Sequence, residues 1–246
     1  MSIELCLLFF VVALLYASAG FGGGSSYLAL MALWGVEFHM MKSTALVCNI
    51  VVVAGGVYHF YMAGHLPMKK ALQISAASIP MAFLGGYLPL SQKTFFLLLG
   101  IALTIAALAM CYKLYVEKNY VPSEDKKGTY KYAIIGSLIG LLSGMTGIGG
   151  GIYLSPVLRL GKYDTAKNIA GLCSFFILVN SIGGLLGQAA KKQLVFDLHF
   201  TTPLLLAVII GGQIGARLSA AVLKQRVVEA ATALLILYAG LNMLFR

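Results

Sequence analysis

The sequence has 246 residues, of which 60% are hydrophobic and only 11% are charged. A soluble domain is nearer one quarter charged, so this composition excludes a soluble globular protein with a polar surface. The formal charge of +10 comes from lysines and arginines scattered among short connections, which is typical of membrane orientation and not of a nucleic-acid-binding face.

Stretches without Asp, Glu, Lys or Arg follow one another along the whole chain, and a membrane helix needs about 20 apolar residues. The first stretch lacks a positively charged start and is too long for a cleaved signal, so we expect it to be retained. We predict an all-α integral membrane protein with eight hydrophobic segments and no soluble catalytic domain, and we expect no enzyme activity. The segments are Leu5–Val36, Ser43–Gly64, Ala71–Gln92, Thr94–Tyr112, Tyr132–Leu158, Asn168–Ala190, Leu198–Ala216 and Ala230–Phe245.

An internal repeat relates the first four segments to the last four. Glycine runs at residues 20–24 and 147–151 open matching patterns in segments one and five. Membrane carriers are often built from two related halves around a central site. We therefore predict a first repeat at residues 1–112, a polar linker at 113–131 and a second repeat at 132–246. The second span of each half also begins with a similar pattern, and the same sequence separation relates each matched pair of residues. The first half has Lys42, Ala45, Cys48 and Asn49, and the second half has Lys167, Ala170, Cys173 and Ser174.

The glycine runs also indicate that segments one and five are broken. A continuous helix over Leu5–Val36 would be roughly 48 Å long, against a hydrocarbon core of about 30 Å. Either a re-entrant hairpin or a broken helix that still crosses fits better. If both segments turn back, 13 of the 18 lysines and arginines lie on one side. The positive-inside rule favours that topology, which makes the two repeats inverted and puts both termini outside.

Irregular backbone at membrane depth is tolerated only where it is buried in protein or lines a wet cavity. The glycine loops at Gly22–Gly24 and Gly149–Gly151 should therefore mark a pathway. Amide groups that open the following arms, at Ser25-Ser26 and Ile152-Tyr153, would present free N–H donors, and a helix N-terminus attracts anions. Close helix packing is the alternative role of such glycines, but the repetition of three consecutive glycines favours an anion cradle.

Polar residues near the start of spans two and six are further candidates, because buried amides and hydroxyls can bond a desolvated anion. Lys42 and Lys167 could steer anions, although we expect them to reach the membrane interface. The two cysteines could contact a sulfur-containing ligand or act as small core residues. The candidate substrate-binding residues are Gly22, Gly23, Gly24, Ser25, Ser26, Ser43, Thr44, Cys48, Asn49, Gly149, Gly150, Gly151, Ile152, Asn168, Cys173, Ser174 and Asn180.

The stretches Gly20–Ser26 and Gly147–Pro156, the starts of spans two and six, and the ending Gly211–Leu218 resemble the sulfite exporter (TauE/SafE) family of bacterial permeases. The resemblance covers nearly the whole chain and implies transport of small sulfur oxyanions or organosulfonates across the bacterial inner membrane. Family members often carry Gly-Thr-Ser at the start of spans two and six. This chain has Ser43-Thr44-Ala45 and Ile169-Ala170-Gly171 there, and Asn168 and Ser174 are candidates to replace the second triplet.

Three functions compete at this point. A secondary transporter for a small sulfur-containing anion fits the cradle, with H⁺ as a candidate coupling ion through His59, His65 or His199. A passive anion channel would use the same loops as a filter. A membrane enzyme would need a nucleophile, base or metal constellation, and no such spacing is present. We expect no cofactor, metal or nucleic-acid partner.

Overall fold

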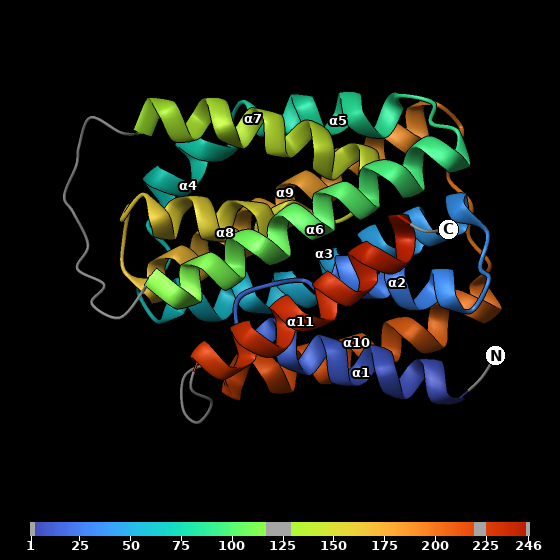
Figure 1. The fold of residues 1–246 in the computed structure, drawn as a ribbon, viewed down its shortest axis with the longest axis horizontal. Coiled ribbons are helices and arrows are strands. Elements are labelled where there is room, and N and C mark those ends of the chain that lie inside the picture. Colours follow the sequence, from blue (N-terminus) through green and yellow to red (C-terminus); the bar gives the residue numbers. More distant parts are fainter. Residues whose placement is uncertain (1–2, 117–128, 219–224, 245–246) are drawn as a thin grey trace.

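The computed structural model describes residues 3–116, 129–218 and 225–244, which form eleven α-helices and no strand (Figure 1). Four of these helices are long and apolar enough, by length and composition, to cross a membrane: α3, α6 over Gln92–Tyr112, α9 and α10. The prediction of an all-helical membrane protein is confirmed to that extent. The helices are α1 (Ile3–Ser18), α2 (Gly24–Leu33), α3 (Phe38–Met62), α4 (Met68–Ser75), α5 (Ser78–Tyr87), α6 (Gln92–Val116), α7 (Thr129–Thr146), α8 (Gly151–Leu160), α9 (Ala166–Ala190), α10 (Leu198–Leu218) and α11 (Gln225–Leu244).

The chain leaves helical geometry at both glycine runs. Between α1 and α2, Gly20 and Gly23 have φ of 81° and 88°, and between α7 and α8, Gly147, Gly149 and Gly150 have φ of 81°, 87° and 84°. Side chains rarely adopt these angles, so glycine ends the helix at each place. In both cases the second arm runs back toward the end of the bundle where the first arm begins (Figure 1).

The third hydrophobic segment, predicted as one span over Ala71–Gln92, is interrupted. Helix α4 ends at Ser75 and α5 begins at Ser78, with a hydrogen bond of 3.0 Å from Ser78 Oγ to the Ser75 carbonyl. Pro80 explains the break, because a proline lacks the N–H that would bond the carbonyl four residues earlier, at Ala76, and its ring crowds that carbonyl. The predicted linker 113–131 covers the end of α6 and the start of α7, and its residues 117–128 lie outside the described residues.

Helix neighbours match between the two halves of the chain. Helix α1 packs on α10 and α7 packs on α5, while α3 pairs with α9 and α6 pairs with α11. Exchanging one half for the other leaves this pattern unchanged. Glycines allow the close approach, since a Cβ on Gly211 would collide with the Phe10 carbonyl of α1 and a Cβ on Gly85 with the Leu141 carbonyl of α7.

Candidate functional site

Asn49 lies near the middle of α3 and contacts both glycine loops. Its Nδ2 donates a hydrogen bond of 2.9 Å to the carbonyl of Ile148, in the second loop. A Cβ placed on Gly22 or Gly24 of the first loop would collide with the Asn49 carboxamide, and one on Gly149 would lie 3.0 Å from Asn49 Nδ2. The side chain is fully buried, and its Oδ1 has no hydrogen-bond partner among the described residues. One amide therefore joins the two loops at the centre of the bundle.

Helix α9 makes the reciprocal contacts. Ser174, which holds the position that matches Asn49 in the repeat, donates a hydrogen bond of 2.9 Å from its Oγ to the carbonyl of Gly20. Each half thus binds the glycine loop of the other half through one buried side chain. Ile177 and Ser181 lie one and two turns further along α9, and a Cβ on Gly149 would come within 2.7 Å of Ile177 and 3.0 Å of Ser181 Oγ.

The first turns of α2 and α8 correct part of the predicted donor set. The N–H of Ser26 bonds the Gly23 carbonyl at 3.0 Å, and the N–H of Tyr153 bonds the Gly150 carbonyl at 3.1 Å. Ser26 and Tyr153 therefore close the helical turn and offer no free N–H. Neither N-terminus is capped by a side chain, because the capping residues are glycines.

The N–H groups that remain at these helix starts belong to Gly24 and Ser25 in α2 and to Gly151 and Ile152 in α8. All four residues are buried, and their N–H groups have no hydrogen-bond acceptor in the part of the chain that the structure describes. The N-terminal end of each helix dipole adds partial positive charge at the same place. Two such N-termini beside one buried amide can stabilise a small anion by hydrogen bonding, without a full charge in the centre of the bundle.

Ser43 and Thr44 lie elsewhere, in a polar cluster at the end of the bundle where α3 begins. Ser43 Oγ donates to Gln188 Oε1 at 2.9 Å, and the hydroxyl of Thr44 lies 3.4 Å from that of Thr201. These contacts join α3 to α9 and α10. Their hydroxyls face α9 and α10, so the structure brings neither hydroxyl to a glycine loop.

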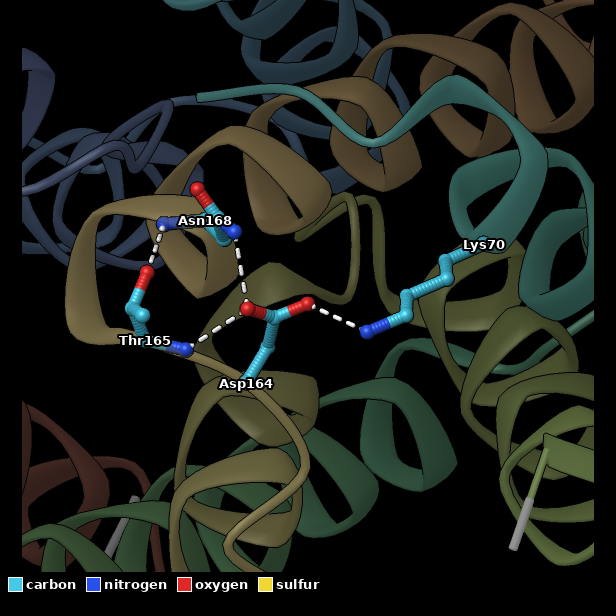
Figure 2. A network of polar contacts seen from close by, with 4 residues as sticks. All are labelled: Lys70, Asp164, Thr165 and Asn168. Carbon is cyan, nitrogen blue, oxygen red and sulfur yellow. Dashed lines mark hydrogen bonds and ion pairs between the residues drawn. The ribbon is translucent and has the colours of Figure 1, made fainter. Parts of the chain in front are cut away.

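Asn168 also lies away from the glycine loops, in the first turn of α9, where it belongs to the polar network drawn in Figure 2. Its Nδ2 donates to Asp164 Oδ1 at 2.8 Å, and the Thr165 N–H donates to the same oxygen at 2.7 Å. Lys70 of α4 forms an ion pair of 2.6 Å with Asp164 Oδ2. The network ties the first half of the chain to the connection between α8 and α9. Asn168 is therefore engaged in holding this connection.

The carboxyl of Asp164 has a lowered pKa. Partial burial raises the pKa, but the hydrogen bonds from Lys70, Thr165 and Asn168 favour the ionised form and outweigh the burial, so the pKa falls below its ordinary value of 3.8. Because the folded pKa lies below the unfolded one, the stabilisation is present above pH 3.8 and is lost as the pH falls through the lowered pKa.

Replacing Asp164 with Asn should therefore lower the free energy of unfolding at neutral pH by about 0.5–1 kcal/mol, a small effect because Lys70 is well exposed. The difference from wild type should shrink as the pH is lowered below about 4. Thermal unfolding in detergent between pH 7 and pH 3 measures both effects. Lys70→Met serves as the matched variant, since it removes the same ion pair from the other side. A difference that is independent of pH would contradict this account.

The other predicted residues are buried around the loops. Cys48 and Cys173 have no exposed area, and Asn180 uses its Nδ2 to bond the Phe176 carbonyl of its own helix at 2.8 Å. Ser26 Oγ lies 2.6 Å from the hydroxyl of Tyr16. The described contacts of Asn180 and Ser26 therefore lie within one half of the chain, whereas Asn49 reaches both loops.

Several residues at the site were not among the predicted ones. Ile177 and Ser181 fall outside the glycine motifs, although Ser181 follows Ser174 by seven residues and so shares its face of α9. Tyr27 fills the space beside Gly23, where an added Cβ would lie 2.7 Å from Tyr27 Cζ. Lys42 corrects another expectation, because it is only 4% exposed and does not reach the interface, whereas Lys167 is exposed as expected.

Comparisons with known proteins agree with this picture of a membrane protein. The model of the family described as sulfite exporter TauE/SafE matches residues 5–243. The chain is 32% identical to the probable membrane transporter protein y4hK of Sinorhizobium fredii over 245 residues, 99% of this chain and 98% of that protein. It is 24% identical to the probable membrane transporter protein YdhB of Bacillus subtilis, over 97% of this chain and 98% of that protein. No solved structure was found to match the chain.

Proposed function

This chain belongs to the sulfite exporter TauE/SafE family, and we propose that it is a secondary carrier for a small sulfur-containing anion such as sulfite, thiosulfate or an organosulfonate. The family and the names of the relatives indicate a multi-pass membrane transporter. The observation that carries the proposal is the meeting of two glycine loops and two uncapped helix N-termini at Asn49. An anion of sulfite size has several oxygens that can each accept a hydrogen bond from such donors.

The proposed architecture is eight hydrophobic segments in two inverted repeats, with segments one and five as re-entrant hairpins. Two observations support it: the arms α1–α2 and α7–α8 double back, and the helix neighbours match between the halves. In this arrangement α3 ends and α9 begins at one end of the bundle, and 13 of the 18 lysines and arginines are expected on that side. We propose that this end faces the cytoplasm and that the membrane is the cell inner membrane.

Transport by alternating access would require the two halves to move about the central loops. Reciprocal bonds from Asn49 and Ser174 hold each loop against the other half. A change in the angle between α3 and α9 would therefore move both loops together. The Lys70–Asp164 ion pair links the halves at the proposed cytoplasmic end, where it would have to open in one of the two states. An ion gradient, with H⁺ as the candidate ion, would supply the energy.

Flux of labelled sulfite, thiosulfate, sulfoacetate and taurine into proteoliposomes tests the proposal, with and without an imposed pH gradient. We expect saturable uptake of at least one of these compounds, with counterflow and a response to the gradient. Single-channel currents without counterflow would instead identify a passive anion channel. Absence of flux for all four compounds, in vesicles that contain correctly folded protein, would remove sulfur-containing anions as the substrate class.

A further inference from the structure

Lys42 is a buried cation that no described carboxylate neutralises. It lies in the second turn of α3 and is 4% exposed. The ion pair between Lys70 and Asp164 does not involve Lys42, and the hydrogen bonds of the described residues give the Lys42 ammonium no acceptor. A buried charge without a partner is destabilising, and proteins keep such charges mainly where they have a functional use.

Ser43, the next residue along α3, holds a second unpartnered donor. Gln188, near the end of α9, is 1% exposed, and its Oε1 accepts a hydrogen bond from Ser43 while its Nε2 has no described partner. Helices α3 and α9 run antiparallel, so Leu46 lies near Gly184 and the next turn outward brings residues 42 and 43 to the level of Gln188. Lys42 and Gln188 therefore lie at one level of the bundle, and neither the Lys42 ammonium nor the buried Gln188 Nε2 has an acceptor among the described residues.

Lys42 also touches the second glycine loop. A Cβ placed on Gly147 would lie 3.0 Å from Lys42 Cγ, so the lysine stem packs directly on the start of this loop. Asn49 follows Lys42 by seven residues, which puts both side chains on the same face of α3 about 10 Å apart along its axis. Asn49 binds the next residue of the loop, Ile148. The two side chains thus mark successive positions along one loop, from the end of the bundle to its centre.

We propose that Lys42 and Gln188 form an anion-binding subsite, the Lys42–Gln188 subsite, that takes the oxyanion substrate before or after it occupies the central loops. This inference rests on the proposed function. The ammonium of Lys42 supplies the charge and Gln188 Nε2 a directed hydrogen bond to an oxygen of a sulfite, thiosulfate or sulfonate group. Ser43 holds the Gln188 carboxamide with its N–H₂ group facing away from Ser43.

The matching lysine in the second half of the chain does not form an equivalent subsite. Lys167 holds the position in α9 that matches Lys42 in α3, yet it is exposed at the opposite end of the bundle. A substrate approaching from the two ends would therefore meet a largely buried lysine at one end and an exposed lysine at the other. A desolvated charge attracts an anion more strongly. The pair of lysines also provides a matched control, since the same substitution can be made at both.

Two measurements on purified protein test the subsite. They compare the wild type with Lys42→Gln, Lys42→Arg and Lys167→Gln. The first is the half-saturating concentration of sulfite and thiosulfate for uptake into proteoliposomes. The second is the rise in melting temperature in detergent that each anion produces, which does not depend on transport. We expect Lys42→Gln to raise the half-saturating concentration at least about tenfold and to remove the anion-dependent rise in melting temperature, the effect of losing a charge-assisted contact. Lys42→Arg should keep most of both, and Lys167→Gln should match wild type.

A merely structural role of Lys42 predicts a different result. Lys42→Met removes an unpaired buried charge, so without anion it should be as stable as wild type or more stable while it loses anion binding. A Lys42→Met protein that melts earlier than wild type and keeps anion-dependent stabilisation would overturn the subsite. The subsite would also be overturned if Lys42→Gln transported the anion with the half-saturating concentration of wild type. The proposed function would then still stand. Anion stabilisation that depends on Lys42 in a protein without flux would keep the subsite and remove the carrier.

Discussion

Asn49→Leu is expected to reduce transport of every anion that the wild-type protein carries by about 10- to 100-fold. The substitution keeps the size of the side chain but leaves the Ile148 carbonyl without its donor and removes the amide that both loops contact. Leaving a buried polar group unpaired costs about 1–3 kcal/mol, which corresponds to that range in affinity. Initial rates of uptake in proteoliposomes measure the effect.

Two further variants separate the role of this amide from general damage. Asn49→Asp keeps the shape and adds negative charge, so it should abolish anion transport even if the protein is as stable as Asn49→Leu. Asn168→Leu makes the same change in the network around Asp164, away from the loops. It should lose only a small part of the stability and keep the uptake rate within about threefold of wild type. Equal losses of uptake in Asn49→Leu and Asn168→Leu would argue against the central site.

Gly23→Val and Gly150→Val are expected to reduce transport to background while the protein still reaches the membrane. Both glycines have φ near 85°, at 88° and 84°, where a β-branched residue is strained by about 1–3 kcal/mol. A Cβ on Gly23 would also lie 2.7 Å from Tyr27 Cζ, and one on Gly150 would lie 2.9 Å from Phe176 Cε1. The loops or these aromatic rings would have to move to admit either side chain.

Gly64→Val is the matched control for backbone strain. Gly64 has φ of 71° in the connection after α3, and a Cβ there would meet nothing within 4 Å. The control carries the same left-handed strain without a collision and far from the glycine loops, so it should lose some stability and keep its uptake rate. If Gly64→Val lost transport as completely as Gly23→Val, strain alone would explain the effect. Uptake and melting temperature, measured on all three variants, decide between the two causes.

The positions of the two breaks at the glycine runs follow from the sequence, because consecutive glycines in an apolar stretch favour a non-helical backbone. The observed φ values near 85° at Gly23, Gly149 and Gly150 are ones that a helix does not allow. The break between α4 and α5 could also have been found, since Pro80 follows Ser78 by two residues and proline favours the first turn of a helix. Hydropathy alone does not predict it, because the stretch from Ala71 to Gln92 has no charged residue, and hydropathy does not distinguish one continuous helix from two shorter ones.

The site was less predictable than the breaks, for reasons visible in single residues. Asn49 could be named because its position repeats, but its bond to Ile148 depends on how the second half packs. Lys42 near a helix start was expected to extend to the interface, as lysines there usually do, yet tertiary packing against Gly147 buries it. Asn168 was placed at the site by its sequence position, and Asp164, only four residues away, holds it elsewhere.

The pairing of α1 with α10 has a consequence for how the protein is made. Helix α1 ends at Ser18 and α10 begins at Leu198, so 198 − 18 = 180 residues separate the two partners. At about 5–20 residues per second, the ribosome needs about 10–40 s between synthesising one and the other. For most of that interval the first hairpin has neither the α10 surface nor the Ser174 hydroxyl to hold it. The newly inserted chain must therefore wait in the membrane with its first glycine loop unsupported, and it closes around the loop only when synthesis is nearly complete.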